Sequence, residues 1–166
     1  MAYLFKLEGR ALEAYNVMVA KLKEKAMREL KLPESEIVIR PLRPEDLGLS
    51  TPEWTFNVGS ATAWNTEIDN TTIADNRFVG INGVLIEESG EMGCTQIKIT
   101  RMGQDVRYWQ IQGVNYLEDS CIFFDDPVTI DQNTTLTVKF YCRTADTDFQ
   151  CCFLGAVAEK RGVLVA

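Results

Sequence analysis

The chain has 166 residues, of which 46% are hydrophobic and 25% are charged, and this balance indicates one soluble globular domain, with room for an appended element. Its 24 acidic residues outweigh 17 basic ones, and the net charge of -7 disfavours nucleic acid and anionic membranes as partners. The absence of histidine excludes Ser-His-Asp and Cys-His catalysis as well as histidine-ligated zinc or haem.

The start of the chain does not have the pattern of a signal peptide. Lys6, Glu8 and Arg10 interrupt the apolar core that such a peptide needs. Apolar runs elsewhere are short, for example residues 151–158, and fall well below the roughly 18 residues that span a bilayer. We therefore expect a protein made in the cytoplasm, with no signal peptide and no transmembrane segment.

An amphipathic helix is expected over residues 8–31. Apolar side chains recur there at steps of three and four, which places Leu12, Tyr15, Val19, Leu22, Ala26 and Leu30 on one face. The opposite face is rich in lysine, arginine and glutamate and is expected to face solvent. Pro33 ends the helix, and residues 37–39 then form a short extended run.

Residues 40–53 contain three of the five prolines, which predicts a semi-rigid extended connector. Leu42 and Leu47 indicate that it packs along a surface. The charge balance changes near the end of this segment: residues 1–48 hold nine basic and eight acidic residues, whereas residues 49–166 hold eight and sixteen. We therefore divide the chain into an N-terminal helix and proline-rich arm, residues 1–53, and a β-sandwich domain, residues 54–166.

From Trp54 onward the pattern is that of β-strands. Apolar and polar residues alternate clearly over residues 95–100 and 136–142. Candidate strands are residues 54–58, 63–68, 77–87, 94–101, 106–112, 121–124, 128–130 with 134–143, and 149–159, with a further one at 163–165. The segments between them are rich in Gly, Asn and Asp, as hairpin turns require. About eight antiparallel strands predict a mainly β fold, an antiparallel β-sandwich, and the lack of Cys-Trp-Cys spacing favours a jelly roll over an immunoglobulin domain.

The five cysteines are Cys94, Cys121, Cys142, Cys151 and Cys152. No C-x-x-C pair occurs, so a zinc site is disfavoured and buried free thiols are the favoured interpretation. A cross-strand bridge between Cys142 and Cys151 remains an open alternative.

Carboxylates are the only plentiful reactive groups. Those that fall in or beside expected loops are Glu87, Glu88, Glu118, Asp119, Asp125, Asp126, Asp146 and Asp148. Catalytic carboxylates must face each other across a substrate, which chain neighbours seldom do, so solvated turns are favoured over a glycosidase site. Calcium would be sought at residues 125–126 and 146–148, because loop oxygens suit that ion. We predict no catalytic residue, no cofactor and no bound metal.

Aromatic residues offer a second class of site. Trp54, Trp64 and Trp109, with Tyr108 and Tyr116, are candidates for a sugar-binding platform. Because Tyr108 and Trp109 are neighbours in an expected strand, they must face opposite sides. One of them is therefore expected in the core and the other on the surface.

Three stretches carry a resemblance to known proteins: residues 73–84, residues 131–137 and the closing Leu154-Gly155-(x)3-Glu159-Lys160-Arg161-Gly162. With these, residues 54–166 resemble the small jelly-roll structural proteins of viruses, namely capsid, turret and decoration subunits. The resemblance implies that residues 1–53 anchor the sandwich to a shell or to sister subunits. The chain lacks the strongly basic N-terminus of capsid proteins that touch the genome, which favours an outer or decoration position.

The favoured hypothesis is a non-enzymatic virion structural protein that forms a trimer or higher homo-oligomer and contacts other capsid subunits, with no small-molecule substrate. Its expected oligomer interface consists of Leu12, Tyr15, Val19, Leu22, Leu30, Leu42, Leu47 and Trp54. This hypothesis predicts that Leu12, Leu22 and Leu30 are buried only in the oligomer. The alternatives are a carbohydrate-binding β-sandwich module, with or without calcium, and a glycosidase that uses two carboxylates.

Overall fold

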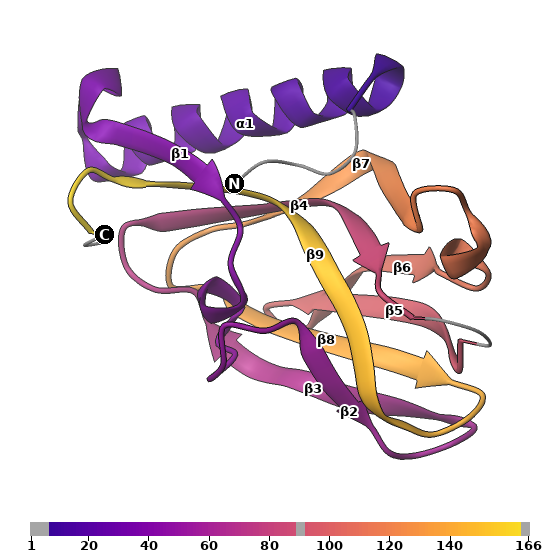
Figure 1. Cartoon of the computed structure of the whole chain (residues 1–166). Helices are drawn as coiled ribbons and strands as arrows, with labels where there is room; N and C mark the ends of the chain where they lie inside the picture. The colour runs from indigo at the N-terminus through magenta and orange to yellow at the C-terminus, as the bar shows by residue number, and fades with distance from the viewer. Residues whose placement is uncertain (1–6, 89–91, 164–166) are drawn as a thin grey trace.

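The structure is a computed structural model that describes residues 7–88 and 92–163 (Figure 1). One helix, α1 (Gly9–Leu30), precedes the strands of this described part. The strands are β1 (Ile37–Pro41), β2 (Thr55–Val58), β3 (Ala63–Thr72), β4 (Arg77–Ile86), β5 (Cys94–Arg101), β6 (Gln104–Gln110), β7 (Cys121–Ile130), β8 (Thr135–Cys142) and β9 (Asp146–Lys160). Three short 3-10 helices, η1 (Glu34–Glu36), η2 (Pro44–Leu47) and η3 (Val114–Tyr116), lie between them. The mainly β class and the N-terminal helix are thus confirmed.

The strands form two antiparallel sheets. In the first, β9 lies between β4 on one side and both β1 and β2 on the other, and β7 pairs with the far edge of β4. The second sheet has the order β3-β8-β5-β6. We call them the five-stranded and the four-stranded sheet.

The strand boundaries differ from the expected ones mainly in β7. It is a single strand, Cys121–Ile130, where two segments were expected. Its pairing with β4 nevertheless shifts between Phe123 and Val128, and Pro127 lies in that irregular stretch. An edge strand tolerates a proline at such a bulge because no neighbour needs its missing N–H. Most of the strand expected at 163–165 lies outside the described residues.

The main hydrophobic core fills the space between the two sheets. Rings of Phe56, Phe140, Phe149 and Phe153 meet there, with Phe56 and Phe140 centroids 4.9 Å apart and those of Phe140 and Phe149 5.4 Å apart. All four side chains are at most 2% exposed. Because most inward positions of the long strands are apolar, this core follows directly from the alternation in the sequence.

Helix α1 covers the outer face of the five-stranded sheet and makes a third layer (Figure 1). Met18, Leu22 and Ala26 pack there against Phe78 and the small residues of β9. The buried residues that the sheet contributes to this contact are Ile37, Phe78, Ala156 and Ala158. The expectation that Leu22 is buried only in an oligomer is therefore wrong, because its own sheet already leaves it 0% exposed.

A glycine in β4 permits this close approach. A Cβ atom at Gly80 would lie 2.6 Å from Met18 Sδ and 2.9 Å from Leu22 Cδ1. Both distances are shorter than van der Waals contact, so a larger residue would force the Met18 and Leu22 side chains to shift.

The proline-rich connector packs into the molecule as expected, since Leu42 and Leu47 join the main core. Arg40 in β1 holds it in place. Its guanidinium donates to both oxygens of Asp46, each at 2.7 Å, and to both oxygens of Glu159, at 2.9 and 3.0 Å. Arg77 completes this cluster, with its Nε 3.3 Å from Glu159 Oε2. We call these four residues the buried ion-pair cluster; it links β1, η2, β4 and β9.

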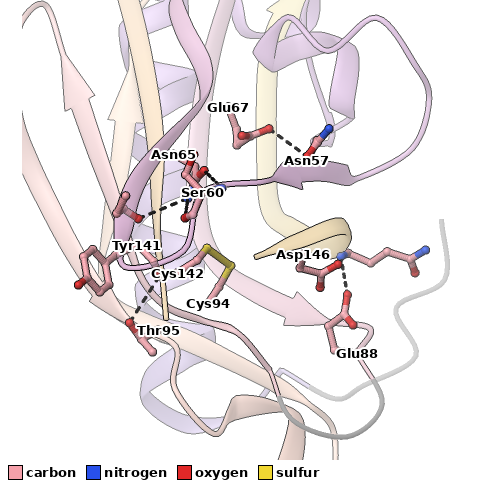
Figure 2. Close-up of a disulfide and its surroundings, with 12 residues drawn as sticks. Asn57, Ser60, Asn65, Glu67, Glu88, Cys94, Thr95, Tyr141, Cys142 and Asp146 are labelled. Carbon is pink, nitrogen blue, oxygen red and sulfur yellow. Dashed lines mark hydrogen bonds between the residues drawn. A yellow bond between two sulfur atoms is a disulfide. The ribbon is translucent and has the colours of Figure 1, made fainter. Parts of the chain in front are cut away.

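Cys94 and Cys142 form a disulfide between β5 and β8 (Figure 2). They are directly opposite each other in the ladder, and both are 0% exposed. The expectation of free thiols is wrong for this pair, and the alternative bridge between Cys142 and Cys151 is wrong as well. The reason is the strand order: β8 pairs with β5, whereas β9, which carries Cys151, lies in the other sheet.

Cys121, Cys151 and Cys152 are free thiols. Burial raises the pKa of Cys121 to about 12 and that of Cys152 to about 11, and it also raises the pKa of Cys151. All three are therefore protonated, and weak nucleophiles, at neutral pH.

No helix in residues 7–88 and 92–163 combines the length and apolarity needed to cross a membrane.

Candidate binding surface on the four-stranded sheet

The aromatic residues singled out in the sequence divide between core and surface. Trp109 faces inward, where its ring stacks on Phe124 with centroids 3.7 Å apart. Tyr108, the preceding residue, faces outward and is 56% exposed. The predicted opposition of these two side chains is confirmed. Trp54 instead packs against Phe153, with ring centroids 5.6 Å apart, and so does not belong to a platform with Tyr108.

On the outer face of the four-stranded sheet, Trp64 lies close to two tyrosines. The centroid of its ring is 6.2 Å from that of Tyr108 and 5.4 Å from that of Tyr141, and both pairs are edge-to-face. Tyr141 was not among the expected residues. The signal that could have found it is the β3-β8 register, which places Trp64 directly opposite Tyr141.

Strand register sets two rows of side chains across this face. One row runs from Thr66 through Lys139 and Lys98 to Tyr108, and these residues are direct ladder partners on β3, β8, β5 and β6. In the neighbouring row, Tyr141 is followed by Gln96 and Gln110. We call Trp64, Lys98, Tyr108, Lys139 and Tyr141 the aromatic-lysine surface.

Lys98 lies at the centre of this surface. Its Nζ is 4.9 Å from the centroid of the Trp64 ring and 5.5 Å from that of Tyr108. Both distances are within the range in which an ammonium group is attracted to an aromatic face. The ammonium group thus lies beside two aromatic rings, and the lysine side chain is only 18% exposed.

Asp105, at the start of β6, fixes the position of Tyr108. The Tyr108 hydroxyl donates to Asp105 Oδ2 at 2.7 Å, and the Thr100 hydroxyl donates to Asp105 Oδ1 at 2.8 Å. These hydrogen bonds lower the pKa of Asp105, and the bond from Tyr108 raises the pKa of that tyrosine. At neutral pH the pair is therefore a carboxylate and a neutral phenol, which is the state in which the bond forms.

Lys139 gives the surface an excess of positive charge. It lies directly opposite Lys98 across the ladder, and like charges in that arrangement repel each other. Asp105 is close enough to Lys98, at 3.8 Å, to form an ion pair, and Lys139 also contributes to the lowered pKa of Asp105. Within the described part of the chain, no carboxylate forms an ion pair with Lys139. Two cations thus share one anion.

The expected oligomer-interface residues do not form one surface. Leu22 belongs to the cluster between helix and sheet, whereas Leu42 and Leu47 belong to the core between the sheets. These three side chains are 0, 4 and 0% exposed because their own chain buries them, so the prediction that they lie at an oligomer interface is wrong. Tyr15, Val19 and Leu30 are partly buried against the helix-sheet cluster, and Trp54 is partly buried against the main core. Of the eight, Leu12 is the most exposed, at 39%.

The expected acidic loops are engaged in contacts within the chain. Asp125 forms an ion pair with Arg10 at 3.1 Å, and Asp126 forms one with Arg107. Asp146 accepts a hydrogen bond from the backbone of Asp148 at 2.9 Å. In the ranges 7–88 and 92–163, no three residues of the Asp, Glu and Cys types gather as metal ligands would.

The sequence has no match among models of protein families and none among curated proteins. Among solved structures, the insecticidal delta-endotoxin Cry8Ea1 from Bacillus thuringiensis is similar over 63% of this chain, with 14% sequence identity and a TM-score of 0.26. The matched region spans 18% of the endotoxin chain. A TM-score this low does not define a shared fold.

Proposed function

We propose that the chain is a non-enzymatic virion structural protein, a capsid-associated or decoration subunit that associates with copies of itself and with other shell subunits. The observation that carries this proposal is the strand pairing, which fits a jelly roll. Jelly rolls are a common architecture of viral capsid domains, and also of lectin domains.

Four ladders nest inside one another in the order that rolling up one long hairpin would produce. β5 pairs with β6, β4 with β7, β3 with β8 and β2 with β9. Successive ladders alternate between the two sheets, and the β4-β9 and β5-β8 pairings join them into the orders β2-β9-β4-β7 and β3-β8-β5-β6. An eight-stranded double-sheet arrangement of this kind supports the jelly-roll assignment.

The disulfide between Cys94 and Cys142 adds support from chemistry. Disulfides persist on virion and cell surfaces and in other oxidising surroundings, whereas reducing cytosol keeps thiols free. A subunit exposed on the outside of a particle would retain this bond.

Native mass tests the proposal. Light scattering over a concentration series should show a trimer or a larger closed assembly. Because Leu12 is exposed, Leu12→Asp should weaken association while leaving the unfolding temperature unchanged. Glu13→Gln, one residue along the same helix, is the matched control and should leave the mass unchanged. A monomer at every concentration would contradict self-association.

Carbohydrate binding is the second candidate function, and the aromatic-lysine surface favours it. An exposed tyrosine, two further aromatic rings and two neighbouring glutamines provide stacking surface and hydrogen-bonding amides on one open sheet face. Binding sites for small polar ligands combine such apolar surface with a few placed polar groups. Loss of saccharide binding in Tyr108→Ala, with an unchanged fold, tests this candidate.

A further inference from the structure

We infer that the aromatic-lysine surface binds a saccharide that carries a carboxylate, with the acid between Lys98 and Lys139 and a sugar ring against Tyr108. The inference rests on the second candidate function and names its ligand class. A group bound there would span β8, β5 and β6, the three strands that carry these residues.

Charge is the first argument. The whole chain has a net charge of -7, yet this face brings two lysines together as direct cross-strand partners. Side chains at such positions have Cβ atoms about 5 Å apart, so one carboxylate can reach both ammonium groups. Asp105 already accepts hydrogen bonds from Tyr108 and Thr100 and is 3.8 Å from Lys98. An external anion beside Lys139 would therefore balance the remaining positive charge.

Shape and rigidity are the second argument. Tyr108 is 56% exposed, and its hydroxyl is held by Asp105 at 2.7 Å. A ring that is fixed before binding loses little conformational entropy when a ligand packs on it. Gln96 and Gln110 lie in the adjacent row, where each offers one acceptor and two donors to sugar hydroxyl groups. The surface thus supplies a ring for stacking, amides for hydroxyl groups and cations for an acid.

A nucleic acid is a poorer fit to the same charges. Its affinity depends on many lysine or arginine contacts to phosphate, whereas this face has two lysines and one carboxylate in a chain of net charge -7. A single acidic group in an otherwise neutral saccharide matches the excess of one positive charge.

Calorimetric titration of the full chain tests the inference with two matched pairs of probes. The acidic probes, each with one carboxylate, are 3′-sialyllactose and cellobiouronic acid, and their neutral partners are lactose and cellobiose. We expect at least one acidic probe to bind about tenfold more tightly than its neutral partner, as one charge-assisted hydrogen bond would allow. Added salt should reduce that difference, because ions screen exposed charges.

Three variants locate the site. Lys139→Gln should lower affinity for the acidic probe about tenfold and leave the weak binding of the neutral probe unchanged. Tyr108→Ala should lower the affinity for both. Lys160→Gln removes the same charge from the five-stranded sheet and is the matched control, which should bind like the unchanged chain. Thermal unfolding of each variant establishes that it is folded.

The outcomes separate the inference from the function on which it rests. Equal affinity for acidic and neutral probes, or an acidic preference that survives in Lys139→Gln, would overturn the acidic ligand and leave carbohydrate binding standing. No binding of any of the four probes would overturn both.

Discussion

The two sheets differ in what their outer faces present, and the difference separates a covered face from an open one. On the five-stranded sheet, the outward positions include Phe78, Gly80 and two alanines of β9, and α1 packs on them. On the four-stranded sheet the corresponding positions hold Trp64, Lys98 and Tyr108, which no helix of the described chain covers. Small and apolar outward residues therefore mark the face that the helix covers, and large polar-tipped ones mark the face that is open to solvent.

The two sheets are also held by different means. The five-stranded sheet has the helix on one side, and the buried ion-pair cluster links its strands to the connector. The four-stranded sheet has no such cover, and a disulfide joins its two central strands. Substitutions on the two sheets should accordingly have unequal effects on stability.

The largest effect is expected where a charge is placed under the helix. Leu22→Asp buries a carboxylate at a position that is 0% exposed and should lower the free energy of unfolding by more than about 4 kcal/mol. Tyr108→Asp, on the open face, should cost less than about 1 kcal/mol. Urea unfolding followed by circular dichroism measures both. If Leu22→Asp does not fold, Leu22→Ala should still cost about 2–5 kcal/mol. Equal effects at Leu22 and Tyr108 would contradict a sealed helix layer.

The next largest effect on stability is expected at the buried ion-pair cluster of the five-stranded sheet, the sheet that α1 covers. Arg40→Met leaves Asp46 and Glu159, both under 5% exposed in their side chains, with Arg77 as the remaining cation of the cluster. Breaking one partner of a buried pair costs about 3–5 kcal/mol, because a buried charge remains uncompensated. The same substitution at the exposed Arg28 is the control and should change stability by less than about 0.5 kcal/mol. Chemical unfolding of the two variants should therefore give clearly separated midpoints.

The disulfide is the matching test on the open side. Replacing both Cys94 and Cys142 with alanine removes a bridge between residues 48 positions apart and should cost about 4 kcal/mol. A reducing agent should lower the unfolding temperature of the unchanged chain in the same direction. Cys121→Ala removes a free, half-buried thiol and serves as the control. Unfolding that is insensitive to reductant would show that the four-stranded sheet does not depend on this bond.

The smallest effect concerns pH and Glu67 in β3. The Asn57 backbone donates to Glu67 Oε2 at 3.2 Å, but burial of the carboxylate has the larger effect and raises its pKa (Figure 2). A raised pKa in the folded chain means that ionisation costs stability as the pH rises through that pKa. Glu67→Gln keeps an acceptor for Asn57 and should be slightly more stable than the unchanged chain at pH 7. The difference should vanish below the ordinary pKa of glutamate, about 4.3, where both forms are neutral. A constant difference across pH would contradict this origin.

Much of the fold could be predicted because periodicity is local. The three-and-four spacing of residues 12–30 predicted a helix over residues 8–31, and the structure has it at Gly9–Leu30. Strict alternation likewise gave β5 its observed bounds, Cys94–Arg101. What covers the helix could not be predicted in this way. An apolar stripe looks the same whether it packs on its own sheet or on a second chain, and only the meeting of Leu22 with Phe78 decides between them.

The candidate site and the disulfide depend on strand pairing and register, that is, on which residues of two strands are direct partners. The sequence alone gives little information about this. Alternation places Cys94 and Cys142 on inward positions, but it does not say that they are opposite each other. The same holds for Trp64 and Tyr141, whose strands are far apart in the sequence. The pairing of β3 with β8 is irregular between Thr66 and Ile68 and again between Ile68 and Thr71, and each irregularity shifts the later positions, which defeats simple counting. That Tyr108 and Trp109 face opposite sides could be predicted because they are neighbours in one strand, but which of the two faces outward could not.

Strand β9 also sets the order in which the molecule can be made. Three strands from the first half of the chain, β1, β2 and β4, all pair with this last strand. A ribosome releases the N-terminal segments first, so β1 and β2 must wait, unpaired, until residues 146–160 emerge. The apolar face of α1 also stays uncovered until then, because Ala156 and Ala158 of β9 form part of the surface on which it packs. Pairings between segments so distant in the chain form slowly. Truncation before β9, or a pause in translation there, would leave a chain with exposed strand edges and an uncovered helix, the state in which this protein is most prone to aggregate.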